Sequence, residues 1–180
     1  MNSTELKKIQ TPLKEKYKLD PAAAFITLKA VGKPSEGITC SIETGRAMTK
    51  AGLHPLTGGD GLTLCSGDML LEALAACAGV TLNAVATAID FKFSDATVTA
   101  EGDLDFRGTL AVDKDASVGF VSVRLIFNIE TSETNERLKT LIKLTERYCV
   151  VYQTLNRANK IEVRCYPDNC TDNQNSITAA

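Results

Sequence analysis

Residues 66–90, SGDMLLEALAACAGVTLNAVATAID, form the most informative stretch of this sequence. Ser66 can cap a helix, and Asp68 would lie in its first turn, where a negative charge suits the helix dipole. The stretch is apolar on nearly all sides, which is typical of a helix buried at the centre of a domain. Small residues such as Gly79 would let another element approach closely. We therefore predict a long, buried central helix that ends near Ile89.

Strands are predicted on both sides of this helix. Two short runs rich in β-forming residues precede it, at 24–31 and 38–43, and the turn between them predicts a hairpin. Two longer runs follow it, at 94–107 and 118–130, and both alternate between apolar and polar residues. A last strand is expected at 160–165.

Helices and a long loop complete the pattern. An N-terminal helix is expected over 4–18, with a break at Pro12. An amphipathic helix is expected over 134–147, and a short helix at about 149–158. Glycines and prolines predict that 44–65 is a long irregular loop. This order of elements predicts an α+β fold, with antiparallel strands grouped around the buried helix.

The length of 180 residues fits one domain with appendages. We expect an N-terminal helical extension over 1–19, the main domain over 20–166, and a polar C-terminal tail over 167–180. The loop that precedes the central helix lies inside the main domain, where long loops are often functional.

Composition excludes several classes of protein. The net charge is −2 and hydrophobic residues make up 44%, so the basic patch of a nucleic-acid binder is not expected. No apolar run is expected to reach the roughly 18–20 residues that span a bilayer, and the polar N-terminus lacks the apolar region of a signal peptide. We expect a soluble cytoplasmic protein that binds neither nucleic acid nor membrane.

The cysteines are the residues with the most chemical potential. The chain contains six of them: Cys40, Cys65, Cys77, Cys149, Cys165 and Cys170. A domain of this size needs no disulfide framework, and the absence of C-x-x-C argues against zinc. The sole histidine, His54, is expected to be a solvated loop residue. The cysteines are therefore either buried thiols or redox thiols.

Two of these cysteines allow a functional and a structural interpretation. Cys77 lies inside the predicted central helix, where a cysteine most often serves as a small buried hydrophobe. Cys149 begins a short helix, and helix N-termini lower the pKa of a thiol. The other four are expected to be bystanders, although Cys65 could lie near the site.

Two motifs resemble those of the osmotically inducible protein C and organic hydroperoxide resistance family (OsmC/Ohr), closest to its OsmC-like branch. They are GGDGLTLCSGDMLLEALAACAGVTLNAVA at 58–86 and ERYCVVYQTL at 146–155, and the resemblance extends over about 20–165. It implies an intertwined homodimer that reduces organic hydroperoxides without metal or organic cofactor. By the same resemblance Cys77 is the peroxidatic thiol, Cys149 is the resolving thiol, and an external dithiol restores both.

The resemblance also implies an arginine, oriented by a carboxylate, that stabilises the Cys77 thiolate. Because Cys77 is expected mid-helix, no helix terminus would serve this purpose, and a cation is required. Arg46 is the first candidate and Arg147 the second, although Arg46 could equally be a solvated loop residue. The family's glutamate is missing from the first turn of the helix, so Asp68 or Glu72 would have to replace it.

Other functions remain open at this point. The same fold could bind a small apolar or thiol-containing ligand without catalysis, which the missing glutamate favours. It could also act as a redox sensor through a disulfide between Cys77 and Cys149. A purely structural role for the cysteines predicts that Cys77→Ala changes stability only.

Overall fold

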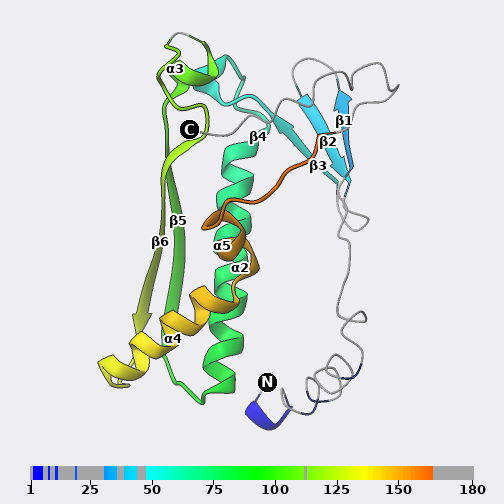
Figure 1. Cartoon of the computed structure of the whole chain (residues 1–180). Helices are drawn as coiled ribbons and strands as arrows, with labels where there is room; N and C mark the ends of the chain where they lie inside the picture. Colours follow the sequence, from blue (N-terminus) through cyan, green and yellow to red (C-terminus); the bar gives the residue numbers. More distant parts are fainter. Residues whose placement is uncertain are drawn as a thin grey trace.

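A computed structural model describes residues 2–5, 8, 11, 19, 31–35, 39–43, 48–111 and 113–163. Two sheets, one long helix and several shorter helices make up these ranges (Figure 1). The elements are β1 (Val31–Ser35), β2 (Thr39–Glu43), β3 (Met48–Gly52), η2 (Pro55–Thr57), β4 (Leu64–Cys65), α2 (Ser66–Ala88), β5 (Asp95–Leu104), α3 (Phe106–Thr109), β6 (Phe120–Glu130), α4 (Asn135–Tyr148) and α5 (Val150–Leu155).

The predicted hairpin is present, but its first strand is displaced along the chain. β1 pairs antiparallel with β2, from Val31 opposite Glu43 to Ser35 opposite Thr39, so β1 occupies most of the predicted turn. Residues 24–30 lie outside the described residues. Pro34 was part of the predicted turn, yet β1 lies at the edge of its sheet, where a proline is tolerated.

The predicted irregular loop at 44–65 contains two strands, so that part of the prediction was wrong. β3 pairs antiparallel with β2, and β4 adds to β3 in parallel through Ala51 opposite Leu64 and Gly52 opposite Cys65. The sheet is therefore not purely antiparallel. The rest of this segment matches the prediction better. It includes the single turn η2, where the His54 Nδ1 accepts a hydrogen bond from the Leu56 N–H at 3.1 Å.

The long helix α2 matches its predicted range, but not its predicted burial. Leu74, Ala78 and Leu82 share one buried stripe, and α2 packs along it against β5, α4 and α5. On another face Val80 is 72% exposed. Within the described part of one chain, α2 is therefore covered on one side only. Its cap also differs, because Cys65 rather than Ser66 precedes the helix and makes no side-chain capping bond.

The apolar character of α2 contradicts the expectation that no apolar run reaches the length of a membrane span. An 18-residue window of α2 reaches a mean hydropathy of 1.7, so the helix is long and apolar enough to cross a membrane. Length and composition alone do not separate such a span from the core helix of a globular domain. In this structure the helix packs against β5, α4 and α5, as Figure 1 shows.

The main core lies between α2, the β5–β6 sheet and α4. Its buried members are Leu82, Val85, Ala86, Phe91 and Leu141. Partly buried side chains from the strands pack against them, including the cross-strand pair Val98 and Phe127. The opposite face of the same sheet carries ion pairs such as Arg124 with Glu101, at 3.0 Å. This alternation is what the two long runs predicted.

A glycine in β5 allows the start of β6 to approach α2. A Cβ atom at Gly102 would lie 2.4 Å from the ring of Phe120, which is closer than side chains can pack. It would also lie 3.3 Å from Leu71 of α2. The missing side chain therefore gives Phe120 a place against β5 and beside the first turns of α2.

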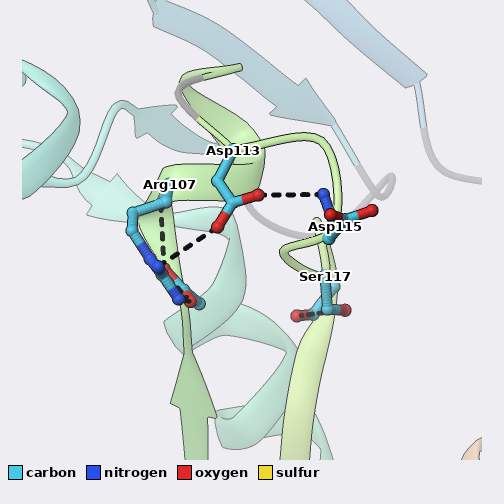
Figure 2. Close-up of polar contacts among 6 residues, drawn as sticks. Arg107, Asp113, Asp115 and Ser117 are labelled. Atoms are coloured by element: carbon cyan, nitrogen blue, oxygen red, sulfur yellow. Dashed lines mark hydrogen bonds and ion pairs between the residues drawn. The ribbon is translucent and has the colours of Figure 1, made fainter.

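The connection between β5 and β6 is held by polar contacts rather than being an open loop. Asp105 caps α3 by accepting a hydrogen bond from the Arg107 N–H at 3.0 Å. The Arg107 guanidinium pairs with Asp105 at 2.6 Å and with Asp113 at 3.2 Å. Asp113 also accepts a hydrogen bond from the Asp115 N–H at 3.0 Å, as Figure 2 shows. The short helix α3 was not predicted from the sequence.

The two C-terminal helices match their predicted positions. α4 begins after Thr134, whose hydroxyl accepts a hydrogen bond from the Arg137 N–H at 3.3 Å. Cys149 alone separates α4 from α5. The predicted strand at 160–165 is not seen in residues 160–163, and its last two residues lie outside the described ranges. Most of the predicted helix at 4–18 also lies outside them.

Candidate active site

Two thiols from distant parts of the chain meet where α5 crosses α2. Cys77 is half-buried and lies near the middle of α2, between Leu74 and Ala78 of the buried stripe. Cys149 is completely buried and links α4 to α5. Both cysteines are free thiols, and they lie near enough for each to affect the pKa of the other through hydrogen bonding. The structure therefore brings the two predicted redox cysteines together.

The position of Cys149 follows from a one-residue break between two helices. Cys149 has an extended conformation that ends α4, while its N–H still bonds to the Thr145 carbonyl at 2.9 Å. Its own carbonyl accepts the first hydrogen bond of α5, from the Gln153 N–H at 2.9 Å. The Gln153 side chain donates back to the Glu146 carbonyl, also at 2.9 Å. These bonds fix the start of α5 against the end of α4.

The surroundings of Cys77 favour its thiolate. Partial burial acts to raise the pKa of the Cys77 thiol. Backbone hydrogen bonds from Val151 and Val150, at the start of α5, act in the opposite direction, as do the Cys149 thiol and the Thr81 hydroxyl. The net result is a pKa below the ordinary value for cysteine. The expectation that no helix terminus could stabilise this thiolate was wrong, because the terminus belongs to α5 rather than to α2.

The surroundings of Cys149 have the opposite effect. Burial raises the pKa of the Cys149 thiol, and the hydrogen bond and charge of Cys77 raise it further. Backbone hydrogen bonds from Tyr152 and Val151 only partly offset this, so the pKa lies above its ordinary value. The start of a helix was expected to lower it, but complete burial outweighs that effect. The opposite directions of the two pKa shifts favour ionisation of Cys77 over ionisation of Cys149.

Each of the two cysteines has a threonine one helical turn away. The Thr81 hydroxyl donates to the Cys77 carbonyl at 2.7 Å. Thr145 is completely buried and its hydroxyl donates to the Leu141 carbonyl at 2.8 Å. Thr81 was not predicted from the sequence, although its position four residues after Cys77 places it on the same helix face. The backbone donors of α5 could not have been found from side-chain identities.

An apolar groove of about 590 Å³ runs from this site along α2. It is lined by Val80, Thr81, Ala84, Val85, Ala88, Ile89, Leu144 and Tyr148. The first of these residues follow Cys77 at helical spacings, so the groove lies on the same face of α2 as the thiol. Its other wall comes from the last two turns of α4. Cys77 is not itself a lining residue, and Thr81, one helical turn after it, connects the groove to the thiol.

The predicted activating residues are not gathered at Cys77 in one chain. Arg46 lies outside the described residues. Arg147 is exposed, and its guanidinium lies 5.7 Å from the centre of the Tyr148 ring. It forms no ion pair with the described part of the chain. Neither arginine can therefore be assigned to the thiolate from these contacts.

The two candidate carboxylates lie away from the face of α2 that carries Cys77. Successive residues of an α-helix are rotated by about 100°, so Asp68 is about 180° from Cys77 around the axis and Glu72 about 140°. Both side chains are exposed and make no ion pair with any described residue. Asp68 does lie in the first turn of α2, as its alternative role beside the helix dipole requires. Their role at the thiolate remains a prediction.

The remaining candidates lie elsewhere or cannot be placed. His54 stacks on Phe106, with 5.0 Å between ring centres, and caps η2. Cys65 is a half-buried free thiol at the start of α2. The backbone of Cys40 is part of β2, whereas Cys165 and Cys170 lie outside the described residues. Within the described ranges, no group of three or more His, Cys, Asp or Glu side chains could hold a metal ion.

Solved structures show where else this fold occurs. An OsmC-like protein from Mycoplasma pneumoniae is 17% identical with a TM-score of 0.61, covering 73% of this chain and 88% of that chain. An organic hydroperoxide resistance protein from Elizabethkingia anophelis, with crystallant-derived thiocyanate bound, is 20% identical with a TM-score of 0.60. That match covers 76% of this chain and 91% of the other. At these identities the likeness shows the fold, and it confirms the predicted mixture of helices and strands.

A third structure has a small molecule in its site. It is an organic hydroperoxide resistance protein from Vibrio cholerae, described as putative, with captopril bound in one of the active sites. It is 18% identical with a TM-score of 0.53, over 76% of this chain and 89% of that chain. A search of curated proteins found no match. The family model described as OsmC-like protein matches residues 58–164, which include both thiols and the whole of α2. The chain therefore belongs to the OsmC-like protein family.

Proposed function

We propose that this protein is a thiol-dependent hydroperoxide reductase in which Cys77 is the peroxidatic thiol and Cys149 the resolving thiol. The observation that carries the proposal is the contact between two free thiols whose pKa values are shifted in opposite directions. Peroxide reduction needs one thiolate to attack and one protonated thiol to follow. The environments of Cys77 and Cys149 supply these two forms in that order.

In the first step the Cys77 thiolate attacks the terminal oxygen of a hydroperoxide, ROOH. An S–O bond forms, the O–O bond breaks, and the leaving alkoxide takes up a proton to become the alcohol ROH. The sulfur is oxidised to a sulfenic acid and the peroxide is reduced. The N–H groups of Val150 and Val151 would hold the thiolate before the attack, because they hydrogen-bond to the sulfur.

In the second step the Cys149 thiol attacks the sulfenic sulfur of Cys77. A disulfide forms and the hydroxyl group leaves as water, with the proton that Cys149 held. An external dithiol then reduces the disulfide by thiol exchange and is itself oxidised to a disulfide. The interaction between the two thiols in the reduced protein supports this second step, because the attacking sulfur is already near its target.

The groove beside Cys77 supports an organic hydroperoxide as the substrate rather than hydrogen peroxide. Apart from Thr81 and the Tyr148 hydroxyl, its lining side chains are hydrocarbon. Bound apolar surface contributes about 25 cal/mol per Å² that is removed from water, which favours substrates with a carbon chain or ring. Two of the structurally similar proteins are described as organic hydroperoxide resistance proteins.

We also propose that the protein works as a homodimer in the cytoplasm. Val80 at the groove is 72% exposed, Tyr148 is 59% exposed, and Val150 at the start of α5 is 71% exposed. A second copy lying across this face would remove these side chains from water and close the groove. Val80→Glu is expected to give a monomer in sedimentation experiments with much reduced turnover.

The direct test uses purified protein, cumene hydroperoxide and a dithiol. We expect steady turnover by the wild type and none by Cys77→Ser. Cys65→Ser is the matched control, because it removes another half-buried free thiol, at the start of α2, and is expected to turn over normally. Equal turnover by wild type and Cys77→Ser would refute the proposal.

One observation favours a second candidate function, binding without catalysis. Among the described residues, no cation or carboxylate contributes to the shifted pKa of Cys77. A thiol without a charged neighbour could hold a small apolar or thiol-containing ligand, and one related structure has captopril in an active site. Stopped-flow measurement of sulfenic acid formation separates the two functions. A rate no higher than that of a free thiol favours binding, and a rate orders of magnitude higher favours the reductase.

A further inference from the structure

Thr81 holds a hydroxyl between the backbone and the sulfur of Cys77. It lies one turn further along α2, is half-buried, and lines the end of the apolar groove nearest the thiol. Its hydroxyl donates to the Cys77 carbonyl at 2.7 Å, and hydrogen bonding by the same hydroxyl is one of the causes that lower the pKa of the Cys77 thiol. A hydroxyl has one proton and two lone pairs, so it cannot donate to both atoms at once.

The protonation state of Cys77 decides which bond is preferred. Toward a neutral thiol, the hydroxyl can accept from the S–H while it donates to the carbonyl. Once the thiol has ionised, the sulfur is an anion without a proton to offer, and a donated hydrogen bond to it is stronger than one to a neutral carbonyl. The carbonyl is not left without a partner, because within α2 it also accepts the backbone N–H four residues on.

We propose that Thr81 is a positioning residue whose hydroxyl turns from the carbonyl to the sulfur of Cys77 when the thiol ionises, holding the thiolate at the mouth of the groove. The donors of α5 approach the sulfur from the other helix, so Thr81 is the donor supplied by α2 itself. The consequence for peroxide turnover rests on the proposed reductase function. The consequence for ionisation of Cys77 does not.

α2 contains a matched control for this inference. The Thr87 hydroxyl makes the same bond, to the Asn83 carbonyl at 2.7 Å, but the residue that accepts it carries an amide rather than a thiol. Thr81→Val and Thr87→Val each remove one such bond from α2 and leave a side chain of nearly the same shape. Any effect of losing a hydrogen bond from a threonine hydroxyl to a helix carbonyl is therefore common to both variants. An effect on Cys77 that occurs only in Thr81→Val comes from Thr81.

The experiment measures iodoacetamide alkylation of reduced full-length protein across a pH series, with the Cys77 peptide quantified by mass spectrometry. A charge-assisted hydrogen bond is worth at least about tenfold in an equilibrium constant. We expect the alkylation midpoint of Cys77 to rise by about one pH unit in Thr81→Val. Thr81→Ser keeps a hydroxyl and is expected to stay at the wild-type midpoint, as is Thr87→Val. A Thr81→Val midpoint equal to wild type, or an equal rise in Thr87→Val, overturns the inference.

Turnover of cumene hydroperoxide is measured on the same variants. We expect kcat/KM to fall about tenfold at neutral pH in Thr81→Val and to recover in Thr81→Ser. If the midpoint rises in Thr81→Val while Cys77→Ser turns over like wild type, the Thr81 inference stands and the reductase proposal fails. If Cys77→Ser is inactive and the midpoint does not move, the reductase proposal stands and the Thr81 inference fails.

Discussion

Gly102→Ala should destabilise the fold because of one close approach between β5 and β6. The added Cβ would lie 2.4 and 2.5 Å from two carbons of the Phe120 ring and 3.3 Å from a methyl carbon of Leu71. The first two distances are more than 1 Å short of ordinary carbon contacts, which are about 3.5–4.0 Å. The ring must therefore move away from β5, and it has the first turns of α2 on its other side.

The magnitude follows from what a forced shift in a packed region costs. Adding a methyl group to a filled site typically costs about 1–3 kcal/mol. Alanine recovers up to about 1 kcal/mol of that cost, because glycine loses more chain entropy when a strand forms. We expect the free energy of unfolding to fall by about 1–2 kcal/mol, measured by urea denaturation at one fixed protein concentration.

Two further variants test whether the cause is the Phe120 ring. A Cβ at Gly119, on the adjoining turn, would meet nothing within 4 Å, so Gly119→Ala should change stability by less than about 0.5 kcal/mol. Phe120→Leu should cost less in the Gly102→Ala background than alone, since the clash is then relieved. Equal stability of Gly102→Ala and Gly119→Ala, or strict additivity with Phe120→Leu, contradicts the reasoning.

The other predictions concern the thiols and the core. Cys149→Ser should leave Cys77 as a sulfenic acid after one equivalent of cumene hydroperoxide, detected as a dimedone adduct, and trapping by Cys149→Ser no greater than by wild type argues against a resolving role. Because the pKa of Cys77 is lowered and that of Cys149 is raised, Cys77 should alkylate first as pH increases; simultaneous alkylation contradicts the assignment. By linkage, the lowered pKa of Cys77 stabilises the fold at pH values above the ordinary thiol pKa, and this stabilisation is lost as pH falls through the pKa of the folded state. The raised pKa of Cys149 has the opposite effect, so its stabilisation is lost as pH rises. Leu141→Ala, at a fully buried position, should lower the free energy of unfolding by about 2–5 kcal/mol in urea denaturation, and a change below 1 kcal/mol would place Leu141 outside the core. Ala84→Leu should fill the groove and lower kcat/KM for cumene hydroperoxide but not for hydrogen peroxide; an equal effect on both excludes the groove as the substrate site.

The elements that were predicted correctly are those whose signal is local. The apolar, alanine-rich run of α2 and the period of α4 are contained within their own residues, and both helices match their predicted ranges to within about two residues. β3 was missed because Met48–Gly52 has glycine and proline nearby and becomes a strand through pairing with β2. Strand formation of this kind depends on a partner that no local window contains.

The candidate site was likewise predicted only in the parts whose signal is local in the sequence. The identities of Cys77 and Cys149 came from their motifs, and the structure brings the two thiols into contact. The direction of the Cys149 shift was mistaken, since the sequence shows a helix start but not the complete burial that outweighs it. The donors to Cys77 were missed because they are the backbone N–H groups of Val150 and Val151, and every residue type except proline carries that group.

Because Cys149 is the residue immediately before α5, its sulfur is attached directly to the start of that helix. When Cys77 of the reduced protein is ionised, the first N–H groups of α5 have an anion to bind. Once a disulfide has formed, that anion no longer exists, so the same N–H groups lose their charged partner at the moment Cys149 becomes covalently tied to α2. Oxidation would therefore replace the electrostatic attraction between α5 and the Cys77 thiolate with a covalent bond between Cys149 and Cys77. Amide hydrogen exchange in the first turn of α5 should therefore be faster in the oxidised protein than in the reduced protein. The backbone of α5 would then report the redox state.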